Sequence, residues 1–189
     1  MSDKLADLIR LFHDHGVYIP TKTIRLTGDV DLDMFDSVLC NLHSLDSKTG
    51  DITIKLMTDG GCVASARGIY DLIKGCKNRV RIICYGEVSS AGTIILQAAD
   101  HRVMATNSKI MIHVGNEGIP SDHPRNVDSL YSEHRVDEKW IEDVYLVKVK
   151  EKKKRFTRNQ MKELLVWDKY MSPKEALELG LIDEIGEIQ

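Results

Sequence analysis

The fold is decided by residues 51–100, which read DITIKLMTDGGCVASARGIYDLIKGCKNRVRIICYGEVSSAGTIILQAAD. Alternating, β-branched residues predict buried strands over 51–59 and 79–88. Each strand leads into a helical pattern, over about 62–76 after the first strand and from about Ser90 after the second. This strand–helix–strand–helix order is typical of an α/β fold in which neighbouring strands lie parallel.

The same order extends to both sides of this stretch. Upstream, TIRLTGDV at 23–30 predicts a strand, and Asp31 is placed to cap a helix over about 32–45. Further elements are expected at 3–14 (helix), 101–106 and 109–114 (short strands), 158–166 and 173–179 (helices opened by capping boxes at Thr157 and Ser172) and in LIDEIGEI (closing strand). We therefore expect one α/β domain that spans residues 1–189.

A long charged segment between about Asn126 and Phe156 interrupts this pattern. A helix of ~30 residues rises ~45 Å, which is too long to lie wholly on a small domain. We expect this helix to project from the body or to pack on another subunit. Its basic end, KVKEKKKRFTR at 148–158, is interpreted as a solvated helix terminus rather than a nucleic-acid site.

The composition excludes several classes of protein. The 189 residues are 42% hydrophobic and 29% charged, which excludes a disordered chain, and the net charge of −3 argues against a general polyanion binder. No apolar run approaches the ~18–20 residues of a membrane span, and the start carries no secretory cleavage pattern. We therefore expect neither a nucleic-acid partner nor a membrane anchor.

The cysteines and histidines favour a reduced, cytoplasmic protein without a metal. Four cysteines contain no CxxC pair, so we interpret most of them as small hydrophobic core residues. His13-Asp14-His15 has the residue types of a metal site but lies at an exposed helix end. We expect no metal and no cofactor.

Four positions carry residue types suited to catalysis, and each also has a structural interpretation. Gly60-Gly61 follows a buried strand, where N–H groups can approach an anion, although most such junctions are tight turns. Ser90 lies at a strand–helix junction, as a nucleophile or as a cap. His113 ends a strand as a general base or a structural histidine. Asp168 is a partner for that base or an exposed loop carboxylate.

Taken together, these positions favour a catalytic interpretation. A serine nucleophile needs a base, and the base needs a carboxylate that fixes its tautomer. Ser90, His113 and Asp168 supply this set in the chain order Ser–His–Asp. In this interpretation Ser89 caps the following helix while Ser90 reacts.

The sequence resembles ClpP, the family of proteolytic subunits of the Clp protease, along nearly its whole length. The resemblance rests on five segments that occur in the family's order and near its spacing. These segments are TIRLTGDV, TDGGCVASARGIYDLI, GEVSSAG, NSKIMIHV and DKYMSPKEALELGLID. The resemblance implies an α/β spiral of strand–helix units, shared by ClpP and the crotonases, with a projecting long-helix handle inserted at about 115–166.

The resemblance also implies a role for each matched residue. The nucleophile falls on Ser90, the base on His113 and the acid on Asp168, while the backbone oxyanion donors fall on Gly61 and Ala91. The implied activity is that of a serine endopeptidase that hydrolyses unfolded proteins and peptides inside a ring-shaped barrel. The subunit itself is expected to bind no ATP.

The implied partners are copies of the same chain and an ATP-driven unfoldase. The resemblance predicts heptameric rings stacked as a tetradecamer through the handle and fed by a Clp-type AAA+ unfoldase. Five apolar side chains of the handle are then expected to be buried only between rings: Val136, Trp140, Ile141, Val144 and Tyr145.

Several positions depart from the family pattern. The family's Ser-Pro-Gly-Gly reads Thr58-Asp59-Gly60-Gly61, the methionine after the nucleophile is Ala91, and the glycine-rich segment after the base reads VGNEGIPSDHP. The handle is also a few residues longer. These departures suggest a divergent branch of the family, with a phage-encoded origin as one explanation.

Two alternative functions remain open from the sequence. The chain is alternatively a non-catalytic ring subunit of a Clp-type complex, although such relatives typically lose a triad residue and this chain has lost none. It is also compatible with a crotonase-type lyase, because those enzymes share the spiral core but need no Ser–His–Asp order.

Overall fold

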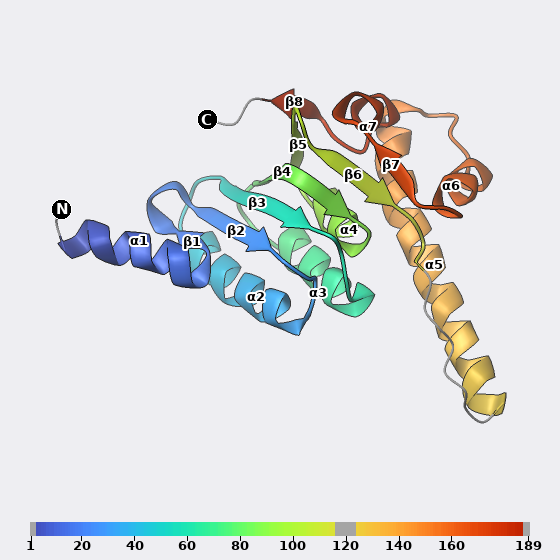
Figure 1. Cartoon of the computed structure of the whole chain (residues 1–189), viewed down its shortest axis with the longest axis horizontal. Helices are drawn as coiled ribbons and strands as arrows, with labels where there is room; N and C mark the ends of the chain where they lie inside the picture. Colours follow the sequence, from blue (N-terminus) through green and yellow to red (C-terminus); the bar gives the residue numbers. More distant parts are fainter. Residues whose placement is uncertain (1–2, 116–123, 187–189) are drawn as a thin grey trace.

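The computed structural model describes residues 3–115 and 124–186. Its strands span Val17–Tyr18 (β1), Thr23–Thr27 (β2), Ile52–Thr58 (β3), Val80–Ser89 (β4), His101–Ala105 (β5), Lys109–Ile112 (β6), Lys169–Met171 (β7) and Glu184–Gly186 (β8). Its helices span Asp3–His15 (α1), Leu32–Asp46 (α2), Val63–Lys74 (α3), Ala91–Gln97 (α4), Pro124–Lys152 (α5), Arg158–Leu165 (α6) and Pro173–Leu179 (α7), and a short 3-10 turn covers Ile19–Thr21. The order of these elements is that of an α/β fold (Figure 1).

The sheet is mainly parallel, as predicted. Its strands follow the order β1-β2-β3-β4-β5-β8, with β6 paired to β4 and β7 paired to β6. The pairs β1–β2 and β6–β7 are antiparallel, and the other pairs are parallel. In Figure 1, α2 and α3 lie side by side along one face of β2, β3 and β4.

Adjacent strands place their buried side chains in register. Ile24 of β2 lies opposite Ile54 of β3, which lies opposite Ile82 of β4, and all three are fully buried. Burial of each such side chain stabilises the fold by about 1.5–3 kcal/mol. A continuous row of isoleucines across three parallel strands therefore fixes the register of the central sheet.

Strand β4 exchanges one of its two neighbouring strands along its length, and the exchange occurs just before Ser90. Residues 81–84 pair with β5, whereas residues 87–89 pair with β6. Between the two halves Gly86 has a φ of 54°, and the pairing with β3 shifts between Leu56 and Thr58. The last residues of β4 therefore keep β3 as a neighbour on one side, where Val88 lies opposite Thr58, and have β6 in place of β5 on the other.

The predicted helix boundaries are confirmed by their caps. The Asp31 side chain accepts a hydrogen bond from the Met34 N–H at 2.8 Å, which caps α2. Both predicted capping boxes are present, at Thr157 before α6 and at Ser172 before α7. Gly180 ends α7 in the left-handed region.

The prediction for the long helix needs a correction. Ile141, Val144 and Tyr145 are 2%, 7% and 0% exposed within the single chain, so their burial needs no second ring. The physical reason is that the second half of α5 lies against α4, as Figure 1 shows, while the first half extends away from the sheet. Trp140 is partly buried on the core, and Val136 remains 59% exposed. Neither α5 nor any other helix in the described ranges is long and apolar enough to cross a membrane.

The interpretation of most cysteines as core residues is only partly correct. Cys84 is buried and Cys76 half-buried, whereas Cys40 and Cys62 are exposed. Burial raises the pKa of the Cys76 thiol to about 11, which keeps this thiol protonated near neutral pH. Two of the four cysteines therefore act as small apolar residues.

Candidate active site

Ser90 occupies a sharp turn between β4 and α4. Its φ of 52° and ψ of −125° lie in a region that costs a non-glycine residue free energy, about 1–3 kcal/mol. Three hydrogen bonds hold the turn. The Ser90 N–H donates to the Met111 carbonyl at 2.8 Å, and the Ser90 carbonyl accepts from the Thr93 N–H at 2.9 Å and from the Thr93 hydroxyl at 2.6 Å. The prediction that Ser89 caps the helix is wrong, because its hydroxyl donates to Glu87 at 2.8 Å.

Strand register brings the other two predicted residues to Ser90. The parallel pairing of β4 with β6 sets Ser89 beside Met111, so Ser90 and His113 leave their strands close together. The antiparallel pairing of β6 with β7 sets Ile112 opposite Lys169. One more step in this register places His113 opposite Asp168.

The three side chains form a continuous chain of hydrogen bonds. His113 Nε2 lies 2.7 Å from Ser90 Oγ, and His113 Nδ1 lies 2.7 Å from Asp168 Oδ1. A carboxylate oxygen can only accept, so Nδ1–H donates to Asp168 and Nε2 is left to accept from the serine hydroxyl. The His113 side chain is 21% exposed and that of Asp168 is 59% exposed. This arrangement can activate a serine nucleophile.

Strand β7 is an element that the sequence interpretation missed. Asp168 was expected in a loop, and it lies immediately before the three residues of this strand. A strand of three residues is too short to show alternation. The aromatic Tyr170 beside Met171 favours a strand, but two residues are a weak signal.

Two glycines let the end of β3 approach the serine turn. A Cβ atom at Gly60 would lie 2.7 Å from Ser90 Cβ, and a Cβ atom at Gly61 would lie 2.5 Å from the Val30 carbonyl oxygen. Both glycines also have left-handed φ angles, 106° and 145°. Only glycine fits these positions without moving the backbone.

The predicted oxyanion donors lie on the two segments that meet at Ser90. Val30 N–H donates to the Gly60 carbonyl and Cys62 N–H donates to the Val30 carbonyl, so the bonds that hold this loop do not use Gly61 N–H. Ala91 is the first residue of α4, where N–H groups lack an intrahelical acceptor. Within the described residues, neither of these two N–H groups has a hydrogen-bond partner, and both can therefore bind a developing oxyanion.

An ion pair between Glu87 of β4 and Lys109 of β6 lies next to the turn at Ser90. Glu87 Oε2 lies 2.6 Å from Lys109 Nζ, and Lys109 also lies over the Tyr170 ring at 5.2 Å. Hydrogen bonds from Lys109 and then from Ser89 lower the pKa of Glu87. These contacts connect β4, β6 and β7, the three strands that carry the site.

Asp59, the departure beside the glycine turn, does not join the triad. Its side chain is exposed, and the Nδ1 of His113 is bonded to Asp168 instead. Its charge is near Lys109, where it contributes to the raised pKa of the lysine, after the larger effect of Glu87.

Two residues for which the sequence interpretation predicted no role at the site, Thr93 and Tyr145, connect the long helix to Ser90. The single hydroxyl hydrogen of Thr93 is donated to the Ser90 carbonyl. The Tyr145 hydroxyl lies 2.7 Å from Thr93 Oγ1 and therefore donates to it. Both side chains are completely buried, and burial raises the pKa of Tyr145. In the sequence Tyr145 is one apolar residue of a helix among several, and no motif marks it.

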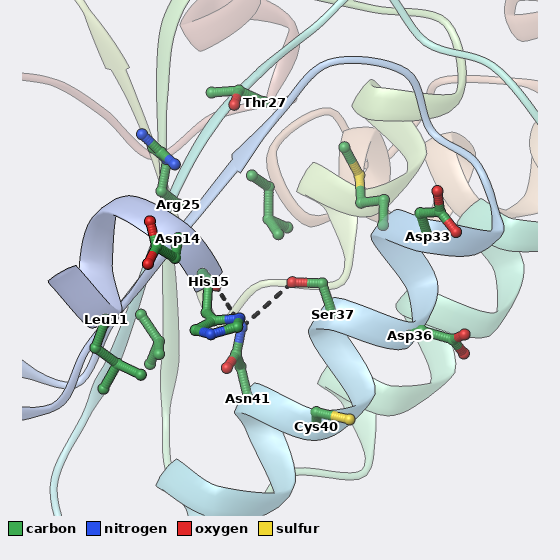
Figure 2. Close-up of a pocket in the computed structure, with 14 residues that line it drawn as sticks. Leu11, Asp14, His15, Arg25, Thr27, Asp33, Asp36, Ser37, Cys40 and Asn41 are labelled. Atoms are coloured by element: carbon green, nitrogen blue, oxygen red, sulfur yellow. Dashed lines mark hydrogen bonds between the residues drawn. The ribbon is translucent and has the colours of Figure 1, made fainter.

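A hollow of about 600 Å³ lies between α1, β2 and α2, and Ser90 does not line it (Figure 2). Asn41 Nδ2 donates there to the His15 carbonyl and to Ser37 Oγ. Of the predicted site residues, none lines this hollow. Across residues 3–115 and 124–186, no group of three or more potential ligands is arranged to hold a metal ion.

Comparison with known proteins identifies the family. The sequence model described as Clp protease matches residues 11–189. The ATP-dependent Clp protease proteolytic subunit of Streptococcus sanguinis is 31% identical over 182 residues, which cover 94% of this chain and 91% of that protein. The protein of the same name from Deinococcus radiodurans is 29% identical over 180 residues, covering 93% and 82%. The chain therefore belongs to the Clp protease family.

The fold agrees with this assignment. The structure of a ClpP1 mutant from Listeria monocytogenes superposes with a TM-score of 0.77 at 27% identity, covering 90% of this chain and 94% of that one. The chain is a divergent, Clp-type serine peptidase, a hydrolase of peptide bonds. Neither a crotonase-type lyase nor a non-catalytic ring subunit is favoured, because the matched relatives are proteolytic subunits.

Proposed function

We propose that this chain is the proteolytic subunit of an ATP-dependent Clp complex and that Ser90, His113 and Asp168 are its catalytic residues. The observation that carries the proposal is the pair of 2.7 Å hydrogen bonds that joins the three side chains at the strained turn. In this proposal the subunit needs no cofactor, because the triad and the backbone N–H groups supply the whole reaction.

The first half of the reaction forms an acyl-enzyme. Ser90 Oγ attacks the carbonyl carbon of the scissile peptide while His113 Nε2 takes the hydroxyl proton. The N–H groups of Gly61 and Ala91 donate to the resulting oxyanion. The C–N bond then breaks, and His113 Nε2 returns its proton to the leaving amine.

The second half releases the acid product. Water attacks the ester carbonyl carbon while His113 Nε2 takes one of its protons. When the second tetrahedral intermediate collapses, His113 returns that proton to Ser90 Oγ. Throughout, Asp168 accepts from His113 Nδ1–H and stabilises the imidazolium ion.

We further propose that copies of the chain form heptameric rings stacked as a tetradecamer. Support comes from the first half of α5, which extends from the body and exposes Leu130, Tyr131 and Val136. A Clp-type AAA+ unfoldase would supply unfolded polypeptides and use the ATP, in keeping with the names of the relatives. The cytoplasm is the proposed location, since none of the four cysteines forms a disulfide in the described residues.

Hydrolysis of an unfolded protein and of a fluorogenic peptide tests this proposal. We expect the wild-type chain to cleave both, Ser90→Ala to cleave neither while it assembles normally, and Ser89→Ala to keep most of its activity. Inactivity of Ser89→Ala with activity of Ser90→Ala would assign the nucleophile to Ser89. Turnover of an acyl thioester by an otherwise peptidase-inactive wild type would instead support a lyase.

A further inference from the structure

A hollow of about 240 Å³ opens directly beside Ser90 and His113. Its apolar walls are formed by Val63, Val114 and Ile141. The side chain that precedes a scissile carbonyl must lie next to the nucleophile and the oxyanion donors, and Gly61 also lines this hollow. The hollow is therefore placed to receive that side chain, which is called P1.

One wall of the hollow comes from α5 and is acidic. It carries Asp137 and Glu138 beside His134. Glu138 also lines a second hollow that shares His113 with the first and is lined by Glu142 and Lys162 as well. The charge that a substrate meets depends on which of these three carboxylates is already neutralised.

Two of the three carboxylates are paired with fixed cations. Asp137 Oδ1 lies 2.6 Å from Arg67 Nη2, and the Arg67 guanidinium stacks on the Trp140 ring at 4.4 Å. Glu142, 6% exposed, accepts from Arg158 at 2.9 Å and lies 3.8 Å from Lys162 Nζ. Their negative charges are therefore largely compensated within the protein.

Glu138 is different. Its Oε1 lies 3.3 Å from Nε2 of His134, one helical turn away, and no Lys or Arg in the described residues pairs with it. Its second oxygen, Oε2, has no hydrogen-bond partner within the described ranges. With 39% of its side chain exposed, Glu138 presents a carboxylate to whatever enters the hollow.

We propose that Glu138 makes this hollow a subsite for a cationic P1 side chain, lysine or arginine. The inference rests on the proposed function and adds the substrate class to it. The apolar walls suit the methylene stem of such a side chain, and the Glu138 carboxylate accepts from its charged head. An acid at the end of the P1 pocket selects basic residues in trypsin by the same logic.

Two fluorogenic peptides that differ only at P1, lysine against norleucine, test this proposal. Both side chains have the same four-carbon stem, so the ratio of their kcat/KM values isolates the charge. We expect the assembled wild type to prefer lysine. In Glu138→Gln the lysine-to-norleucine ratio should fall about 10-fold or more, the lower end of the effect of a charged hydrogen bond because Glu138 is partly exposed.

Two further variants complete the design. Glu138→Lys should lower the ratio further, since it places a like charge against the substrate. Glu133→Gln removes an exposed carboxylate from the same helix but outside both hollows and should leave the ratio unchanged. Circular dichroism of each variant checks that the fold is retained.

The outcomes separate this inference from the proposed function. A wild type that prefers norleucine, or a Glu138→Gln variant with the wild-type ratio, would overturn the cationic subsite while Ser90 chemistry stands. A folded wild type that hydrolyses neither peptide and does not react at Ser90 with a fluorophosphonate would overturn the proposed function, and the subsite with it.

Discussion

At the scale of single residues, the geometry of the site depends on backbone register. His113 and Asp168 face each other because β6 and β7 pair antiparallel with Ile112 opposite Lys169. Ser90 meets His113 because the end of β4 runs parallel to β6. A shift of one residue in either pairing would turn one of the side chains away.

Replacing Asp168 by asparagine tests the role of this carboxylate. We expect Asp168→Asn to lower kcat by up to about 10⁴-fold, because the amide can hold His113 in the wrong tautomer. The matched variant Asp59→Asn changes the other nearby carboxylate, which is exposed and does not contact His113, and it should keep most of its activity. Steady-state peptide hydrolysis measures both.

The assignment would change if the two variants behaved the other way round. Near-normal turnover in Asp168→Asn with loss in Asp59→Asn would make Asp59 the partner of the base.

The three residues of the candidate site could be predicted from residue types, whereas the hydrogen bonds that hold the Ser90 turn in place could not. The chemistry of Ser90, His113 and Asp168 in this chain order was sufficient to expect that they meet. The Tyr145–Thr93 connection was not predictable, because it depends on which face of α5 packs on α4. The hydrogen bond from Ser89 to Glu87 was missed for a similar reason: it needs the position of a side chain two residues earlier on a strand.

At the scale of elements, the buried Arg102 of β5 holds the segment that follows α7 against the sheet. Arg102, 3% exposed, donates through Nη1 to the Gln97 side chain and to the Gly180 carbonyl. Its Nε and Nη2 donate to the two oxygens of Asp183, and its backbone N–H donates to the same carboxylate. The segment after α7 is therefore held against β5 by one charged pair.

Neutralising Asp183 should cost stability that depends on pH. Burial alone would raise the pKa of Asp183, but the hydrogen bonds from Arg102 outweigh it and lower that pKa below its usual 3.8. A lowered folded-state pKa means that the carboxylate stabilises the fold above pH 3.8 and loses this effect as the pH falls through the lowered value. We expect Asp183→Asn to lower the free energy of unfolding by about 2–3 kcal/mol at pH 7, less than for a fully buried pair, because Asp183 is partly exposed.

Urea unfolding of this variant at pH 7 and at pH 3 measures the effect. The difference from wild type should shrink at the lower pH. Glu184→Gln breaks the neighbouring pair of Glu184 with His101, whose side chains are 48% and 33% exposed, and should cost clearly less stability than Asp183→Asn because water screens this pair. Equal losses in the two variants, or a constant loss at both pH values, would contradict this account.

The element order was largely predictable, and the packing of α5 was not. Strands β3 and β4 carry strong alternation, and the helix caps at Asp31, Thr157 and Ser172 are local signals that short-range physics enforces. The apolar residues of α5 form a broken stripe, so its periodicity does not tell which half packs on the body. Tertiary contacts with α4 decide that question.

At the scale of the whole molecule, α5 divides into a packed half and a projecting half. The helix has 29 residues and is ~43 Å long, and its first half extends away from the sheet in Figure 1. Leu130, Tyr131 and Val136 of this half are 43%, 51% and 59% exposed. These side chains, unlike the buried Ile141 and Tyr145, are exposed and could contact the proposed second ring.

Charged substitutions on the two halves should therefore have different effects. We expect Tyr131→Glu with Val136→Glu to split the proposed double ring into single rings or smaller species while each subunit stays folded. Ile141→Glu should instead unfold the subunit, because it buries a charge in the core. Sedimentation velocity and thermal unfolding by circular dichroism distinguish the two results.

Val147→Glu is the matched control, since Val147 is 61% exposed but lies on the half of α5 that packs on the body. It should sediment like wild type. A double variant at Tyr131 and Val136 that also sediments like wild type would show that the projecting half is not an interface between rings.

The central claim is that Ser90 is the activated nucleophile, and labelling with a fluorophosphonate tests it most directly. The reagent bonds covalently to a serine Oγ that a neighbouring base has activated, and mass spectrometry of the digested protein identifies the serine. We expect one adduct per chain on Ser90, in the wild type and in Ser89→Ala, and no adduct in Ser90→Ala. An adduct on Ser89, or a folded and assembled wild type that takes up no label, would contradict the account.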